Sequence, residues 1–176
     1  MSKTIKIISV ITLVFTIVFA LLYSFIDTDV FLTLAITFGT TAYHFIVRLI
    51  IGGVINAVMK NKADYNKKWY RVDKIEMKFY KIIGVKKWKN KMPTYNNDFF
   101  DINKHSWDEI IGAMCQAEVV HETIAIFSFL PVIATVWFGA FWVFLITSVC
   151  GAIFDLMFVF MQRFNRQRIL KMKSKR

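Results

Sequence analysis

At Ala117-Glu118-Val119-Val120-His121-Glu122, a lysine-rich polar segment gives way to a long apolar run. Ionisable side chains are costly in hydrocarbon, and those found within membrane spans usually serve a function. Glu118 and His121 are three residues apart, so on a helix they share a face and are predicted to touch. A carboxylate that orients an imidazole is the simplest unit for moving a proton near neutral pH. The stretch therefore predicts a membrane helix that begins with a candidate catalytic pair; the alternative is a purely structural hydrogen-bonded pair.

The composition of the chain is that of a membrane protein. Of its 176 residues, 56% are hydrophobic, which is too apolar for an ordinary soluble domain. The net charge of +11 in such a chain favours basic faces toward anionic lipid, and we expect no nucleic-acid partner. Cys115 and Cys150 lie beside or within apolar runs, which argues against a disulfide framework. We expect one domain over residues 1–176.

Four apolar runs predict an all-α integral membrane protein. The predicted spans cover residues 7–26, 31–59, 118–138 and 141–161, because about 20 residues cross a hydrocarbon core. The first run is too long for a signal peptide and lacks a clear cleavage site, so an uncleaved span is expected. Pro131 is predicted to kink the third span.

Residues 60–117 form the only sizeable polar segment and separate spans two and three. Between Lys68 and Ile83, apolar side chains recur at helical spacing among lysines, which is typical of a helix lying in the membrane interface. The alternative is a helix packed on its own domain. Ser106-Trp107-Asp108-Glu109 reads as a capping box that begins a helix running into Glu118.

The distribution of charge predicts the orientation of the chain. Four spans place both termini and residues 60–117 on the same side, together with all basic residues outside the spans. The first turn on the other side carries only Asp27 and Asp29. By the positive-inside rule the basic side is cytoplasmic, so we expect a multi-pass cell-membrane protein with both termini in the cytoplasm.

This topology gathers the unusual polar residues near the inner face of the membrane. They are His44, Arg48, Glu118, His121, Asp155, Arg163, Asn165 and Arg166. Convergent ionisable groups predict a binding or active site. For His44 and Arg48 the alternative is snorkelling or structural pairing. The dispersed histidines predict no metal site, and the absence of a Walker loop or a GxGxxG fingerprint predicts no nucleotide cofactor.

Four short motifs occur in a specific order in the second half of the chain. They are Lys86-Lys87-Trp88-Lys89-Asn90-Lys91-Met92-Pro93, then Ala117-Glu118-Val119-Val120-His121, Leu130-Pro131, and Gln162-Arg163-Phe164-Asn165-Arg166-Gln167-Arg168. The combination resembles the glycosyl-4,4'-diaponeurosporenoate acyltransferase family of bacteria, small membrane proteins of the last acylation step in staphyloxanthin-type carotenoid synthesis. The first half of the chain resembles the family poorly.

The resemblance implies a membrane acyltransferase with an activated acyl donor, such as acyl-CoA, and a lipid-linked glycoside acceptor among the membrane lipids. It implies that His121 is the general base and that Glu118 orients it. The remaining implied substrate-binding residues are Arg163 and Arg166 on donor phosphates, Asn165 at the oxyanion, and the loop of Trp88 and Lys89 over the headgroup. His44 and Arg48 are added as substrate-binding residues on position alone. The alternative function is a non-catalytic four-helix scaffold or small carrier.

Overall fold

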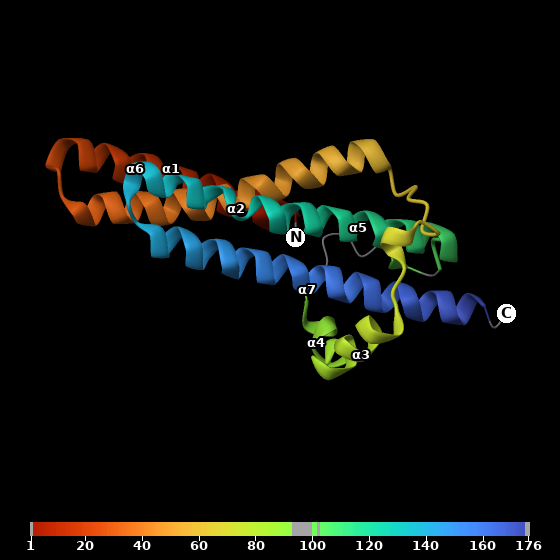
Figure 1. Cartoon of the computed structure of the whole chain (residues 1–176). Coiled ribbons are helices and arrows are strands. Elements are labelled where there is room, and N and C mark those ends of the chain that lie inside the picture. Colours follow the sequence, from red (N-terminus) through yellow and green to blue (C-terminus); the bar gives the residue numbers. More distant parts are fainter. Residues whose placement is uncertain (1, 93–99, 102, 175–176) are drawn as a thin grey trace. The chain divides into compact units, whose positions relative to one another are not determined.

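The computed structural model describes residues 2–92, 100–101 and 103–174, and every regular element within them is a helix (Figure 1). Four segments are long and apolar enough to cross a membrane. They contain α1 (Ser2–Ile26), α2 (Asp29–Met59), α5 (Trp107–Phe127) and α7 (Phe141–Lys173). The all-α fold with four apolar helices is therefore confirmed. Pro93, the last residue of the Lys86–Pro93 motif, lies outside the described residues.

Helix α5 begins where the sequence predicts. The backbone N–H of Ser106 donates to the Glu109 carboxylate at 2.8 Å, and the N–H of Glu109 donates back to the Ser106 hydroxyl at 3.3 Å. This reciprocal capping box satisfies donors that the first turn leaves unpaired. From Trp107 the helix continues without a break through Glu118 and His121, so both side chains stand on rigid backbone.

The third apolar run is broken at Pro131. Helix α5 ends at Phe127, the 3₁₀ helix η4 covers Leu130–Ala134 with Pro131 at its start, and α6 covers Thr135–Phe138. A proline cannot donate to the preceding turn, and the tighter 3₁₀ geometry replaces the α-helical ladder at this point. Gly139 then adopts a positive φ of 75° and separates α6 from α7, as the predicted junction near residues 138–140 requires.

The polar segment after α2 contains short helices in place of one helix over residues 68–83. These are η1 (Lys68–Tyr70), α3 (Lys74–Ile82), α4 (Val85–Trp88) and η2 (Lys89–Lys91). The chain is extended at Arg71, and α3 starts afresh because the Asp73 side chain accepts the backbone N–H of Glu76 at 2.7 Å. The prediction of a single continuous helix was wrong because this second cap went unrecognised.

The chain divides into two compact units, which are described separately. The first comprises residues 1–51 and 124–153, and the second comprises 52–123 and 154–176. In the first unit, Phe15 and Phe19 of α1 pack against Phe38 of α2 with ring centroids 5.0 and 5.5 Å apart. Much of the apolar surface of α1 remains uncovered by protein, as expected of a helix that faces lipid.

The second unit has two hydrophobic clusters. One contains Tyr70, Ile110, Ile111, Met114, Cys115 and Ile169, and the other contains Tyr80, Val85 and Phe164. Both join α7 to the short helices or to α5, and α3 and α4 lie beside α7 in Figure 1. Cys115 and Cys150 are both free thiols. The expectation of one domain over residues 1–176 stays a prediction.

Candidate functional site

The second unit brings His121 of α5 against Asp155 of α7. The His121 Nδ1 atom lies 2.9 Å from Asp155 Oδ1, and the imidazole stacks on Phe158 with centroids 4.3 Å apart. Asp155 is fully buried, whereas the His121 side chain is 21% exposed. In the tautomer with the proton on Nδ1, the imidazole donates to the Asp155 carboxylate and Nε2 is the acceptor nitrogen. The arrangement is an oriented imidazole that a substrate can approach.

Glu118 has other partners than the sequence predicts. Its two carboxylate oxygens accept from the guanidinium groups of Arg163 and Arg166 on α7, and Glu118 and Arg166 are fully buried. Helical spacing places Glu118 and His121 on one face, but the arginines of the neighbouring helix satisfy the buried charge more completely than a neutral imidazole would. The predicted Glu118–His121 contact is therefore corrected: the carboxylate paired with His121 is Asp155.

Arg163 uses its full set of donors inside the protein. Its Nε and one terminal nitrogen bind Glu76 at 2.5 and 3.1 Å, and its other contacts are Glu118 and the carbonyls of Trp69 at 3.0 Å and Arg71 at 2.9 Å. A guanidinium has five N–H groups, and these five contacts occupy all of them. Arg163 thus ties α7 to α5, to α3 and to the chain between η1 and α3.

Arg166 completes this buried network. It donates to Glu118 and to the Tyr70 carbonyl at 2.6 Å, and its guanidinium lies 5.2 Å from the centroid of the Tyr70 ring. Neither arginine presents a guanidinium fork to solvent, since Arg166 is fully buried and the Arg163 side chain is only 13% exposed. The geometry supports a structural role for both and offers little room for donor phosphates.

Glu76 is the second carboxylate of the network. Burial alone would raise the pKa of its carboxyl, but hydrogen bonds from Arg163 and Tyr80 hold that pKa below its usual value. Burial and the Glu76 carboxylate raise the pKa of the Tyr80 hydroxyl, which stays protonated as the donor. One turn beyond Glu118, Glu122 accepts from the Trp69 indole N–H at 2.9 Å.

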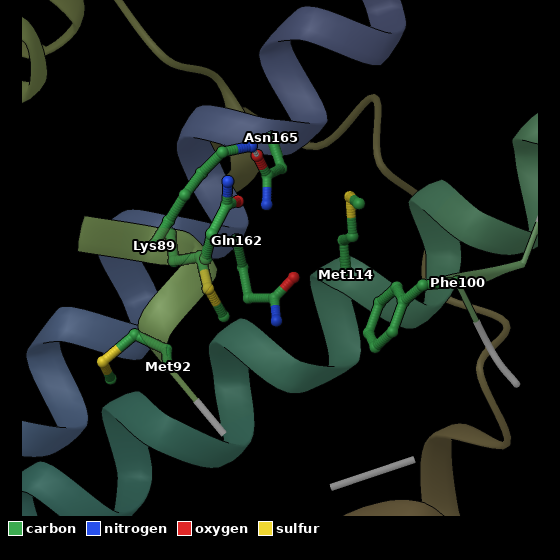
Figure 2. A pocket seen from close by; sticks show the side chains of 8 residues that line it. Lys89, Met92, Phe100, Met114, Gln162 and Asn165 are labelled. Atoms are coloured by element: carbon green, nitrogen blue, oxygen red, sulfur yellow. Dashed lines mark hydrogen bonds between the residues drawn. The ribbon is translucent and has the colours of Figure 1, made fainter. Parts of the chain in front are cut away.

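A pocket of about 240 Å³ lies in the same unit (Figure 2). It is lined by Lys89, Asn90, Met92, Phe100, Met114, Met161, Gln162 and Asn165. The Lys89 ammonium donates to Asn165 Oδ1 at 2.6 Å, so two predicted binding residues meet here. Trp88 packs instead in the cluster of Tyr80 and Phe164, with its indole N–H on the Ile83 carbonyl at 3.1 Å.

The remaining predicted residues belong to the first unit. Arg48 donates to the His44 backbone carbonyl one turn earlier, at 2.7 Å. The His44 ring is buried against Gly151, where an added Cβ would meet the imidazole at 3.2 Å. The contact of Arg48 favours structural pairing for this residue, and a substrate-binding role for His44 and Arg48 stays a prediction. No group of three potential metal ligands occurs among the residues that the structure describes.

Comparison with known proteins identifies the family. The family model for glycosyl-4,4'-diaponeurosporenoate acyltransferases matches residues 66–175, well over half of the chain. The chain belongs to this family. The matched region contains His121, Asp155, Glu118 and the pocket, whereas α1 and α2 lie outside it. Searches of curated proteins and of solved structures return no match.

The sequence does not indicate the partners of two residues of this site, Asp155 and Glu76. Asp155 is a lone acid inside an apolar run, and that isolation marks it as a residue in need of a partner. For Glu76, Asp73 three residues earlier indicates the start of a helix, but no feature of the sequence indicates Arg163 as the partner of its carboxylate. Pairings across helices depend on the register of α5, α7 and α3, which spacing along one helix does not provide.

Proposed function

We propose that this chain is an integral membrane acyltransferase that moves a fatty acyl group from an activated donor to a hydroxyl of a glycosylated lipid. Membership of the acyltransferase family supports the reaction class. The observation that supports the chemistry is the pairing of a partly exposed His121 with a fully buried Asp155.

In this proposal His121 is the general base. The acceptor hydroxyl donates to Nε2, the imidazole takes the proton as the oxygen attacks the acyl carbonyl carbon, and a tetrahedral intermediate forms. When the intermediate collapses, the bond to the leaving group breaks and the imidazolium returns the proton to that group. Asp155 fixes the tautomer and stabilises the imidazolium, as the acid of a catalytic triad does.

Glu118, Arg163 and Arg166 hold the reacting helices in register. All three lie in one network that joins α5 and α7; Glu118 and Arg166 are fully buried, and the Arg163 side chain is only 13% exposed. We therefore move Glu118 from orienting His121 to positioning the helix that carries it. For the same reason, we no longer assign binding of the donor's phosphates to Arg163 and Arg166.

The proposed location is the cytoplasmic face of the cell membrane, with four spans and both termini inside. Asp27 and Asp29 are the charged residues of the turn between α1 and α2, and the junction at Gly139 and Ala140 carries none. The basic residues outside the predicted spans fall on the opposite side, as the positive-inside rule requires of a cytoplasmic face.

Helix α3 is proposed to rest in the interface. Ile75 and Ile82 are 80% and 75% exposed; Lys78 and Lys81 stand between them, and Lys74 immediately precedes Ile75. Tyr80, on another face of α3, packs against Phe160 of α7. Apolar tips flanked by lysine stems suit the boundary between headgroups and acyl chains.

The direct test is transfer by purified full-length protein in phosphatidylcholine nanodiscs, with a radiolabelled acyl-CoA and a glycosylated lipid. His121→Gln and Asp155→Asn should lower kcat by about 10²-fold or more, since positioned acid–base groups contribute about 10²–10⁴-fold. His105→Gln, the same change near the start of α5, is the matched control. Melting temperatures should match the parent for His121→Gln. A His121→Gln variant as active as the parent would remove the base from the mechanism, and parent protein that transfers nothing from acyl-CoA, acyl carrier protein or phospholipid would favour the scaffold.

A further inference from the structure

A cation, Lys89, lines the pocket in Figure 2. The Lys89 ammonium lies 5.8 Å from the centroid of the Phe164 ring, and the Arg168 guanidinium lies 5.9 Å from the same centroid. Burial, with the positive charges of Arg168 and Lys86, lowers the pKa of the Lys89 ammonium. Lys89 and Arg168 therefore lie near the same aromatic ring, and Lys86 precedes Lys89 by three residues.

These cations differ from the buried arginines in the partners that the protein supplies. The Lys89 ammonium donates to the neutral amide oxygen of Asn165. Within the described residues, no carboxylate forms an ion pair with Lys86, Lys89 or Arg168, whereas Glu118 and Glu76 neutralise Arg163 and Arg166. Lys89 is partly buried, whereas Lys86 and Arg168 are exposed, so an anion that enters the pocket would meet the Lys89 ammonium with two solvent-facing cations near by.

Methionine and phenylalanine side chains line part of the pocket, together with polar amides. Met114 of α5 and Met161 of α7 face the same space as Phe100, with Gln162 beside them (Figure 2). Methionine side chains adapt to flexible hydrocarbon. At about 240 Å³ the pocket is smaller than the ~300–1,000 Å³ typical of a whole ligand. It therefore accommodates a headgroup and the first atoms of a larger, mostly external molecule.

We propose that this pocket binds the phosphate of an amphiphilic acyl donor, with Lys89 and Arg168 near the phosphate oxygens and Met114 and Met161 against the adjoining carbon chain. This assignment rests on the proposed acyltransferase function and names its donor site. Met114 and Gln162 are each seven residues from His121 and Asp155 respectively, or about 10 Å along their helices. The donor's reactive carbonyl would thus extend along α5 and α7 toward His121.

The test is binding, measured apart from turnover. Octanoyl-CoA and coenzyme A are titrated by calorimetry into full-length protein in phosphatidylcholine nanodiscs, and phosphatidylglycerol binding is counted by native mass spectrometry. Lys89→Ala/Arg168→Ala removes two cations of the cluster. Lys67→Ala/Lys171→Ala removes the same charge from exposed positions outside the pocket and is the control.

Loss of two charge-assisted contacts should weaken binding by about tenfold or more in the cluster variant, and the control should remain near the parent. Selective loss for octanoyl-CoA supports the site and identifies a soluble thioester donor, whereas selective loss for phosphatidylglycerol supports it and identifies a membrane phospholipid. Equal affinities in parent and cluster variant, or no binding of any probe to the parent, would overturn it. Parent protein that binds through the cluster but transfers no acyl group would refute the proposed function alone, and transfer with an unaffected cluster variant would refute the site alone.

Discussion

Replacing Glu118 with glutamine should destabilise the protein strongly. The substitution keeps the size of the side chain but removes the carboxylate shared by Arg163 and Arg166. Arg163 retains Glu76, whereas Arg166 keeps only the Tyr70 carbonyl and the neutral amide of the new residue. A fully buried guanidinium without its carboxylate costs about 3–5 kcal/mol. For a chain of this length, about 1 kcal/mol shifts Tm by roughly 2–4 °C, so the expected loss is on the order of 10 °C.

The assay is thermal unfolding in detergent, followed by tryptophan fluorescence. Glu122→Gln is the matched control, since it lies one turn away on α5 and leaves an oxygen to accept from the Trp69 indole. It should melt within a few degrees of the parent, as expected for a loss of about 1 kcal/mol. Adding Arg166→Met to Glu118→Gln removes the stranded charge and should recover part of the loss. The reasoning fails if Glu118→Gln melts like Glu122→Gln, or if the double variant loses the full sum of both single effects.

Three further predictions concern other parts of the chain. The folded-state pKa of the Glu76 carboxyl is depressed, so its contribution to stability is present above about pH 4.5, the unfolded value, and is lost as the pH falls through the lower folded pKa. Glu76→Gln should therefore reduce the fall of Tm at acid pH, and an unchanged fall would exclude this linkage. Gly112→Ala should destabilise the protein because the added Cβ would overlap the Asn61 carbonyl oxygen. Gly52→Ala, with open space around it, should be neutral or stabilising by up to about 1 kcal/mol. Equal melting temperatures for the two variants would contradict the close packing of α5 against Asn61. A spin label at Ile82 should relax more with oxygen than with a water-soluble nickel complex, and a label at Lys81 should show the reverse; preference of both labels for nickel would place α3 away from the membrane.

The sequence predicts the helices well because their signals are local. Ser106 and Glu109 predict the start of α5, and Pro131 predicts the break after it. The length of the apolar runs predicts the membrane spans. The start of α3 was predictable by the same logic from Asp73, whose cap separates it from η1.

The site is less predictable because its contacts join distant segments. Glu118 and His121 were correctly identified as neighbours on a helical face, but their partners, Arg166 and Asp155, come from α7. Which of two carboxylates meets the imidazole depends on how α5 and α7 align, and a single sequence does not contain that register. The pocket at Lys89 depends likewise on η2 lying beside Asn165.

The central claim is that His121, held by Asp155, transfers an acyl group to a glycosylated lipid. Mass spectrometry of lipids from cells that express the parent or His121→Gln at equal levels tests this most directly. Parent cells should contain a glycolipid heavier by one fatty acyl group, and the unacylated form should accumulate in His121→Gln cells. Identical lipid profiles in the two cell lines would contradict it.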